Sequence, residues 1–283
     1  MDICVVCRDK TSGFQPFWPG VKQCSNCGHC MPDVDARSLN LKVMYGDGYF
    51  SGGEYVDYLR DRSVFEKQFR DRLQDVKKYQ SGGDLVEIGC AYGFFLAVAQ
   101  ESYRVRGFDI AEGPVAYARE CLGVEARCED FLDASVEPES VDIVVMWDTI
   151  EHLPRPDLTI DKIVRVLRPN GFLFLTTGDI GSVLARARRE RWRLIRPPSH
   201  LHYFSRKTIA RLLENGGLRP VEIKYVGVRR SLRQTVYSLL VLRKQHPPSR
   251  LYRLIADSPV GDLSFVLNTY DIMLVVAQKS QVI

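Results

Sequence analysis

The fold is indicated by nine residues, Leu85-Val86-Glu87-Ile88-Gly89-Cys90-Ala91-Tyr92-Gly93. The first four form a short, largely apolar run that is typical of a buried parallel strand. Two glycines then allow a tight turn into an apolar helix over residues 94–99. A second strand over residues 104–108 leads into Asp109, 22 positions after Glu87. This order predicts the start of an open α/β sheet.

Two carboxylates in this unit indicate what it binds. Asp109 follows a strand, where a carboxylate can accept hydrogen bonds from a ribose diol. No Gly-x-Gly-x-x-Gly is present, and Glu87, two residues before the first glycine, would repel a pyrophosphate. The same charge suits a cofactor that carries an ammonium group and a sulfonium. The pattern favours an adenosine cofactor other than a dinucleotide, which makes a dehydrogenase the least favoured class.

The alternation of strands and helices continues along the chain. Further strands are expected near Ala126 and over residues 141–146, 172–176, 221–225 and 272–278. Asp157 can cap one intervening helix and Ser205 another. The sequence predicts an α/β fold with a doubly wound, Rossmann-like, mostly parallel seven-stranded sheet.

Composition limits the class of protein. The chain has 283 residues, of which 45% are hydrophobic and 26% charged, as in ordinary soluble proteins. No terminal segment looks like a signal peptide, and no apolar stretch approaches the ~20 residues that cross a bilayer. We expect a cytoplasmic protein with one α/β domain and smaller appended parts.

Four of the eight cysteines form two Cys-x-x-Cys pairs, Cys4 with Cys7 and Cys24 with Cys27. This spacing supplies four thiolates for a tetrahedral Zn²⁺, as in a zinc ribbon. The alternative is four buried free cysteines. A ribbon can bind substrate or act as a structural staple for a segment too small to have its own core, and we favour the staple.

These signals divide the chain into three expected parts. Residues 1–34 are a zinc ribbon, and residues 35–80 are an aromatic and helical connector or cap. Residues 81–283 are the cofactor-binding domain, with basic insertions at 179–204 and 227–265.

The chain resembles the class I S-adenosylmethionine (SAM) methyltransferases over roughly residues 84–225. Their first motif, Glu/Asp-x-Gly-x-Gly-x-Gly, matches residues 87–93 except that Ala91 replaces the middle glycine. Residues 147–153 (Trp-Asp-Thr-Ile-Glu-His-Leu) and 200–205 (His-Leu-His-Tyr-Phe-Ser) are similar to later segments of that family. Two zinc knuckles before such a core are similar to methyltransferases that modify sugars and other natural products.

The resemblance implies SAM as cofactor and assigns its contacts. The loop at 87–93 would surround the amino-acid end of SAM, and Asp109 would bind the ribose hydroxyls. Ile110 and Asp130 would contact the adenine, together with the backbone after Asp130. The implied cofactor contacts are Glu87, Gly89, Ala91, Gly93, Asp109, Ile110, Asp130, Phe131 and Trp147.

Methyl transfer to a hydroxyl needs alignment and a base, and histidine is suited because its pKa lies near neutrality. The candidate catalytic residues are His152, His200, His202 and Asp148. Glu151 can orient the ring of His152, or the two can brace the following helix. His200 and His202 can instead satisfy backbone carbonyls, and Asp148 is a candidate acceptor of a substrate hydrogen bond.

Residues 186–253 contain 18 Lys and Arg but only three acids, a local charge of +15. A solvated helical face is one explanation. Another is an anionic acceptor, since clustered arginines bind phosphate bidentately. Residues 229–253 can also support peripheral membrane contact, with about 1 kcal/mol for each basic residue near anionic lipid.

The leading hypothesis is a SAM-dependent methyltransferase acting on a hydroxyl of a phosphate-bearing sugar, glycan or natural-product intermediate. An RNA methyltransferase is the nearest alternative. It ranks second because the Asn/Asp-Pro-Pro-Tyr signature for exocyclic amines and a basic–aromatic RNA module are both missing. A non-catalytic zinc-ribbon adaptor with a degenerate methyltransferase fold is the third.

Overall fold

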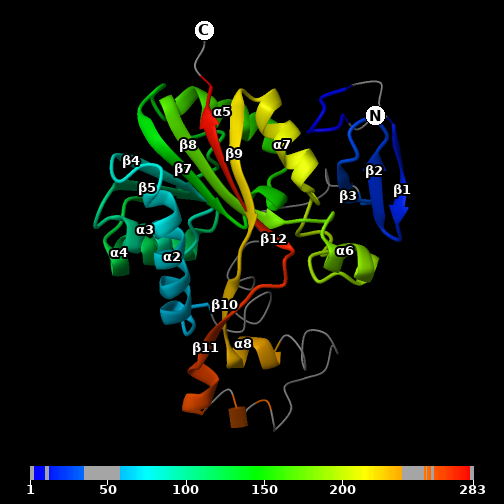
Figure 1. Ribbon diagram of the computed structural model, residues 1–283. Coiled ribbons are helices and arrows are strands. Elements are labelled where there is room, and N and C mark those ends of the chain that lie inside the picture. Colours follow the sequence, from blue (N-terminus) through cyan, green and yellow to red (C-terminus); the bar gives the residue numbers. More distant parts are fainter. Residues whose placement is uncertain are drawn as a thin grey trace.

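The computed structural model of the protein describes residues 3–9, 13–34, 58–237 and 258–280, together with Tyr252, Leu254 and Ile255 (Figure 1). Its central sheet has seven strands: β4 (Asp84–Ile88), β5 (Arg104–Asp109), β6 (Ala126–Cys128), β7 (Val141–Trp147), β8 (Leu167–Gly178), β9 (Leu218–Tyr225) and β12 (Ile272–Lys279). Their order is β6-β5-β4-β7-β8-β12-β9. β12 runs antiparallel to β8 and β9, whereas β4 to β8 pair in parallel. The predicted mostly parallel seven-stranded sheet is confirmed.

Helices cover both faces of this sheet. The helices are α2 (Arg62–Lys77), α3 (Phe94–Ala99), α4 (Glu112–Leu122), α5 (Pro156–Val166) and α7 (Arg206–Asn215). Alternate strand residues divide the core, because successive side chains of a strand point to opposite faces. Leu85 and Val145 pack with α2, α3 and α4, whereas Val86 and Val144 pack with α5 and α7. The arrangement is a three-layer α/β/α fold.

One of the two predicted helix caps is confirmed and the other is wrong. Ser205 caps α7 as expected, and Thr208 completes a reciprocal capping box with it. The expectation that Asp157 caps α5 is wrong, because the helix starts at Pro156 after Arg155. Proline fits the first helical position, since its φ is fixed and the missing N–H would have no helical partner.

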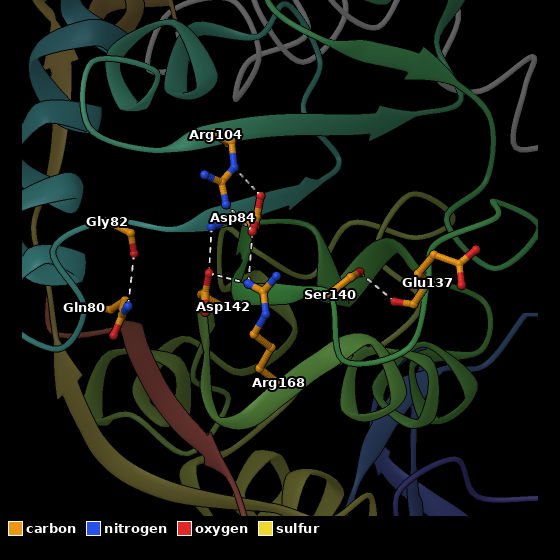
Figure 2. Close-up of polar contacts among 8 residues, drawn as sticks. All are labelled: Gln80, Gly82, Asp84, Arg104, Glu137, Ser140, Asp142 and Arg168. Atoms are coloured by element: carbon orange, nitrogen blue, oxygen red, sulfur yellow. Dashed lines mark hydrogen bonds and ion pairs between the residues drawn. The ribbon is translucent and has the colours of Figure 1, made fainter.

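The amino ends of four parallel strands are joined by a charge network (Figure 2). Arg104 donates to both carboxylate oxygens of Asp84 at 2.7 Å. Arg168 donates to Asp84 at 3.0 Å and to Asp142 at 2.6 Å. The hydrogen bond from Arg104, aided by Arg168, lowers the pKa of Asp84 to about 2. These contacts connect β4, β5, β7 and β8 at one edge of the sheet.

The N-terminal residues form a separate antiparallel sheet of β1 (Phe14–Trp18), β2 (Val21–Cys24) and β3 (Cys30–Pro32), which we call the ribbon together with residues 3–9. Arg8 donates to Asp161 on α5 at 2.6 Å. Asn215 of α7 donates to the Val6 carbonyl at 2.8 Å. The ribbon thus packs against the α5 and α7 side of the core (Figure 1).

Two insertions extend the fold beyond the sheet. The first follows β8 and contains α6 (Val183–Arg188) and η4 (Arg189–Arg191). The second separates β9 from β12 and contains β10 (Val228–Ser231), α8 (Leu232–Tyr237), η6 (Pro259–Asp262) and β11 (Ser264–Leu267). β10 pairs with β11 in a two-stranded sheet that the sequence did not predict, and the pair projects beyond the lower end of the main sheet in Figure 1.

Several expectations fall on residues outside the described ranges. They concern residues 35–57 of the expected connector and residues 238–251 of the apolar and basic C-terminal region. Within the described ranges, none of the helices combines the length and apolar character needed to cross a membrane.

Candidate active site

A cavity opens at the carboxyl ends of β4, β5 and β7, and we call it the strand-end cavity. The sequence-predicted site residues that line it are Gly89, Ala91, Asp109, Ile110, Asp130, Phe131, Trp147, Asp148 and His152. Phe65, Gln68 and Phe69 of α2 form another side of its wall. Glu87 of β4 and Gly93 at the start of α3 are not among the residues that line it. The sheet thus brings most of the predicted cofactor residues into one hollow.

Local geometry explains the glycine loop after β4. Gly89 and Gly93 have φ of 77° and 73°, a region that favours glycine. A Cβ on Gly89 would lie 2.6 Å from Thr149 Cγ2, and a Cβ on Gly93 2.8 Å from Ala118 Cβ. Ala91 has φ of 44°, which costs a residue with a side chain about 1–2 kcal/mol. The loop therefore keeps its turn despite the missing middle glycine.

Asp109 is held by two backbone amides. Its Oδ2 accepts from Ala91 N at 2.8 Å, and its Oδ1 accepts from Ala111 N at 2.9 Å. Burial raises the pKa of Asp109, and these hydrogen bonds oppose the shift. Each carboxylate oxygen retains a second lone pair. Asp109 thus connects the glycine loop to the next loop and can accept further hydrogen bonds in the strand-end cavity.

Two buried polar atoms around this cavity have no protein partner among the described residues, Glu87 Oε2 and Trp147 Nε1. Such atoms are rare in folded proteins. Burial, with a contribution from Asp109, raises the pKa of Glu87 well above its usual value. An acceptor and a donor without partners fit a ligand that carries an ammonium group and a carboxylate. The residues present therefore suit the amino-acid end of SAM.

A second cavity, which we call the arginine-lined cavity, adjoins the first. Phe65, Gln68, Asp148 and His152 line both cavities. The first insertion contributes Arg193, Leu194, Arg196 and His200, and the second contributes Val228, Arg229, Arg230, Ser231 and Gln234. Because these four residues line both cavities, the two cavities are neighbours at His152 and Asp148.

His152 ends the short helix η3 (Ile150–His152) after β7. Its Nδ1 lies 2.8 Å from the Ser199 carbonyl oxygen, which can only accept. The neutral ring therefore has its proton on Nδ1 and its lone pair on Nε2. Burial lowers the pKa of His152, partly opposed by Ser199 and Asp148, so the ring is neutral at pH 7. This state is the one a general base requires.

Glu151 lies close to His152, because a carboxylate oxygen of Glu151 and one ring nitrogen each of His152 and His200 all lie within 4.8 Å of one another. Its Oε2 accepts from Thr177 Oγ1 at 2.9 Å, whereas the Ser199 carbonyl orients the imidazole. Burial and the nearby charge of Asp148 raise the pKa of Glu151 to about 8. Glu151 also lines the arginine-lined cavity. Because its pKa is about 8, its carboxyl group is largely protonated at pH 7.

The other two candidate histidines lie in different places. His200 lines the arginine-lined cavity, and its ring packs edge-to-face on His152 with 4.6 Å between centroids. His202 lines neither cavity. Its Nε2 lies 3.0 Å from the Leu153 carbonyl oxygen, its Nδ1 lies 3.0 Å from His29 Nε2, and burial lowers its pKa to about 4. The structure does not bring His202 to the reacting position, and the sequence contained no signal for its contact with His29.

The remaining predicted polar residue, Asp148, is at the junction of the cavities. It has φ of 50°, and its Oδ1 accepts from Thr176 Oγ1 at 2.9 Å. Asp130, which also lines the strand-end cavity, accepts from Leu132 N at 2.9 Å in a local turn. Both are partly open to solvent and can accept a hydrogen bond from a ligand.

Ion pairs neutralise part of the basic region. Arg193 pairs with Asp271 at 2.9 Å and Arg229 with Asp71 at 3.1 Å. Arg233, which is 2% exposed, pairs with Asp61 at 3.2 Å. The charge of +15 is therefore not all available to a partner, because acids from distant parts of the chain pair with several of these arginines.

The predicted cysteine cluster forms in the ribbon. The Sγ atoms of Cys4 and Cys27 are 3.5 Å apart, those of Cys7 and Cys24 are 3.7 Å apart, and all four lie within 4.8 Å of one another. A tetrahedral zinc site with Zn–S bonds near 2.3 Å has sulfurs about 3.8 Å apart. The four thiols fit such a site.

A family model described as a methyltransferase domain matches residues 58–223. The ubiquinone biosynthesis O-methyltransferase of Photobacterium profundum is 30% identical over 103 residues, which cover 34% of this chain and 44% of that enzyme. The enzyme of the same name from Cupriavidus pinatubonensis is 27% identical over 178 residues, covering 56% and 68%. The chain thus matches less than half the length of the first of these relatives.

Solved structures share the fold. A possible methyltransferase from Bacillus halodurans has a TM-score of 0.55 at 17% identity, covering 75% of this chain and 98% of that one. A SAM-dependent methyltransferase from Thermotoga maritima, described as a possible histamine N-methyltransferase, has a TM-score of 0.51 at 21% identity, covering 79% and 95%.

Proposed function

This chain belongs to the SAM-dependent methyltransferases of class I, and on that basis we propose that it methylates a hydroxyl of a small anionic acceptor. We further propose that the acceptor is a phosphate-bearing sugar, glycan or natural-product intermediate. The observation that carries the proposal is the wall shared by the strand-end and arginine-lined cavities, where His152 and Asp148 lie.

We propose the predicted cofactor residues as the SAM site. SAM supplies a methyl group that its sulfonium already activates. Asp109 would hold the ribose hydroxyls, and Ile110 and Asp130 would contact the adenine. Trp147 Nε1 would donate to the carboxylate at the amino-acid end, and the unpartnered Glu87 Oε2 would accept from the ammonium group. A cation at that point would oppose the burial that raises the pKa of Glu87. Alignment by such contacts supplies about 7–11 kcal/mol toward a bimolecular transfer.

The proposed base is His152. Its Nε2 takes the hydroxyl proton, while the Ser199 carbonyl holds the proton on Nδ1 and stabilises the imidazolium that forms. Asp148 accepts a hydrogen bond from a neighbouring hydroxyl of the acceptor. A positioned base contributes about 10²–10⁴-fold in rate when the acceptor is a weakly acidic alcohol.

The walls of the arginine-lined cavity support an anionic acceptor. Arg193, Arg196, Arg229 and Arg230 line it, although Arg193 and Arg229 also pair with Asp271 and Asp71 outside the cavity. Of its three acids, Asp61 pairs with Arg233 and Glu151 is largely protonated at pH 7, which leaves Asp148. Phe65, Leu194, Val228 and Ile272 add apolar surface. The apolar surface and the names of the ubiquinone biosynthesis relatives favour a phenolic quinone precursor as the second candidate acceptor.

We also propose that the ribbon holds one structural Zn²⁺ through Cys4, Cys7, Cys24 and Cys27. The distances between their sulfur atoms support this. Purified protein should contain one zinc per chain, and Cys24→Ser should lose the metal and lower the melting temperature. Metal analysis that finds no zinc in wild-type protein of full stability would refute the site.

The function is tested by calorimetry and by a screen. SAM should bind the zinc-loaded protein, and labelled methyl groups should appear on nucleotide-linked or lipid-linked saccharides, or on a phenolic quinone precursor. Absence of SAM binding would favour the non-catalytic adaptor. Salt-sensitive RNA binding with label transferred to RNA would favour the RNA methyltransferase.

A further inference from the structure

The segment at residues 199–203 lies between the ribbon and the loop that carries His152. On one side, Tyr203 N donates to the Cys30 carbonyl of β3 at 2.9 Å. On the other, Leu201 N and His202 N donate to the Glu151 carbonyl at 2.8 and 3.1 Å. The same segment supplies the Ser199 carbonyl that orients His152. The ribbon and the proposed base are thus attached to one short piece of chain.

A buried pair of histidines crosses the same space. His29, two residues after the ribbon's last cluster cysteine, is fully buried and stacks on His202 with 5.2 Å between ring centroids. His29 Nε2 lies 3.0 Å from His202 Nδ1, and His202 Nε2 lies 3.0 Å from the Leu153 carbonyl. Leu153 follows His152 directly and lines the strand-end cavity. A continuous hydrogen-bonded path therefore runs from the ribbon to the catalytic loop.

The hydrogen-bond roles along this path follow from the last acceptor. The Leu153 carbonyl can only accept, so His202 carries its proton on Nε2 and accepts on Nδ1. His29 must then donate its Nε2 proton. Without that donor, the buried Nδ1 of His202 has no partner, at a cost of about 1–3 kcal/mol. Turning the His202 ring to avoid this cost would break its bond to Leu153.

We infer that His29 is a positioning residue that acts through His202 to hold the His152 loop in its reactive geometry. The ribbon is then part of the active-site framework as well as a staple. Arg8 and Asn215 attach the ribbon to α5 and α7, and its cysteines and valines pack in the main core. The His29–His202 pair adds ring packing to this attachment, and among the described residues it alone supplies a hydrogen-bonded connection to Leu153.

The inference rests on the proposed role of His152, and its test needs no acceptor. The chain has five histidines, so the full-length protein with labelled imidazole nitrogens gives a spectrum that can be assigned by substitution. Nitrogen NMR distinguishes a proton on Nδ1 from one on Nε2. Wild-type His152 should show the Nδ1–H form, and SAM calorimetry on the same samples tests the proposed function separately.

Three variants make the comparison. His29→Phe keeps a ring beside Phe204 and removes the donor, so His152 should become a mixture of both tautomers while the melting temperature shows a folded protein. His29→Gln restores an N–H donor and should restore the Nδ1–H form. Arg8→Gln weakens the ribbon's contacts with Asp157 and Asp161 of α5 but keeps the His29–His202 pair, so it should leave His152 unchanged. Once an acceptor is known, His29→Phe should lower kcat by about tenfold or more and change the KM for SAM little. Loss of a residue that orients an active-site side chain has effects of this size.

Some results would overturn the inference. One is an unchanged His152 spectrum in folded His29→Phe. Another is a His152 spectrum that changes as much in Arg8→Gln as in His29→Phe. That result would mean that the ribbon acts only by stabilising the fold. His29→Leu, which leaves space instead of filling it, replaces His29→Phe if the larger ring prevents folding. Failure of SAM to bind wild-type protein would reject the proposed function while leaving the tautomer result to be judged independently.

Discussion

The two edges of the central sheet differ in how completely their polar groups are paired. At the amino edge, Asp84, Arg104, Asp142 and Arg168 pair with one another (Figure 2). At the carboxyl edge, buried polar atoms of β4 and β7 have no partner among the described residues. The same strands therefore end in a satisfied network at one edge and in unsatisfied groups at the other.

This difference has a physical meaning. A buried polar atom without a partner costs about 1–3 kcal/mol, and a non-glycine residue at positive φ costs a similar amount. Glu87 and Trp147 have the first feature, and Ala91 and Asp148 have the second. Positive φ also occurs near the amino edge, at Glu139 before β7 and at Asn170 in β8. The unpartnered buried atoms therefore distinguish the carboxyl edge, and they are what a bound ligand would satisfy.

The largest predicted effect is a loss of turnover on replacing His152, which lines both cavities. His152→Ala should lower turnover of an identified acceptor by about 10²–10⁴-fold, because it removes the proposed base. Calorimetry should show SAM affinity within about threefold of wild type, because the cofactor contacts remain. Asp84→Asn, at the other edge, is the matched control and should keep full turnover. Full activity of His152→Ala would mean that the acceptor arrives ionised or that another group takes the proton.

The second-largest predicted effect is a loss of affinity for SAM. Asp109→Ala should weaken SAM binding at least tenfold, about 1.4 kcal/mol, because the ribose loses its acceptor and the glycine loop loses the bond from Ala91. Asp84→Ala, on the preceding strand, should leave SAM affinity unchanged and lower the free energy of unfolding instead. Equal SAM affinities for both variants in calorimetry would remove Asp109 from the cofactor site.

Much of the cofactor side was predictable because its signals are local. The strand–helix–strand unit from Glu87 to Asp109 depends on residues close in sequence. Each predicted strand overlaps an observed one. Strand ends place Gly89, Asp109 and Trp147 at one edge, since parallel strands finish together. These features follow from periodicity and turn chemistry alone.

The acceptor side was less predictable because it depends on contacts between distant residues. His29 and His202 are 173 positions apart, and Arg233 and Asp61 are 172 apart. A local count of charges indicated a positive surface, but it could not show that Asp271 and Asp71 pair with two of the arginines. Nor did any pattern place Gln68 of α2 against Arg229 of β10, where the side-chain oxygen accepts from the backbone at 2.6 Å.

A smaller effect is expected from pH at the amino edge. The pKa of Asp84 falls to about 2 in the folded protein, mainly through Arg104, against about 3.9 in an unfolded chain. Because the folded value is the lower one, its contribution to stability is present above pH 4 and is lost as pH falls toward 2. Urea unfolding of Asp84→Asn should therefore show a weaker loss of stability between pH 4 and pH 2 than wild type. Identical slopes would show that the network does not stabilise the fold.

The smallest effect is expected at Ala91, where strain and entropy oppose each other. Ala91→Gly removes about 1–2 kcal/mol of left-handed strain, while the freer unfolded chain of glycine costs about 0.4–1 kcal/mol. The free energy of unfolding should therefore rise by about 1 kcal/mol or less, and SAM affinity should stay within about twofold, because the Ala91 amide still donates to Asp109. A large gain in SAM affinity would mean that the Ala91 methyl group crowds the cofactor. A clear loss of stability would mean that this methyl group makes packing contacts in the loop that outweigh the strain, and that the backbone at the carboxyl edge is less strained than its φ value indicates.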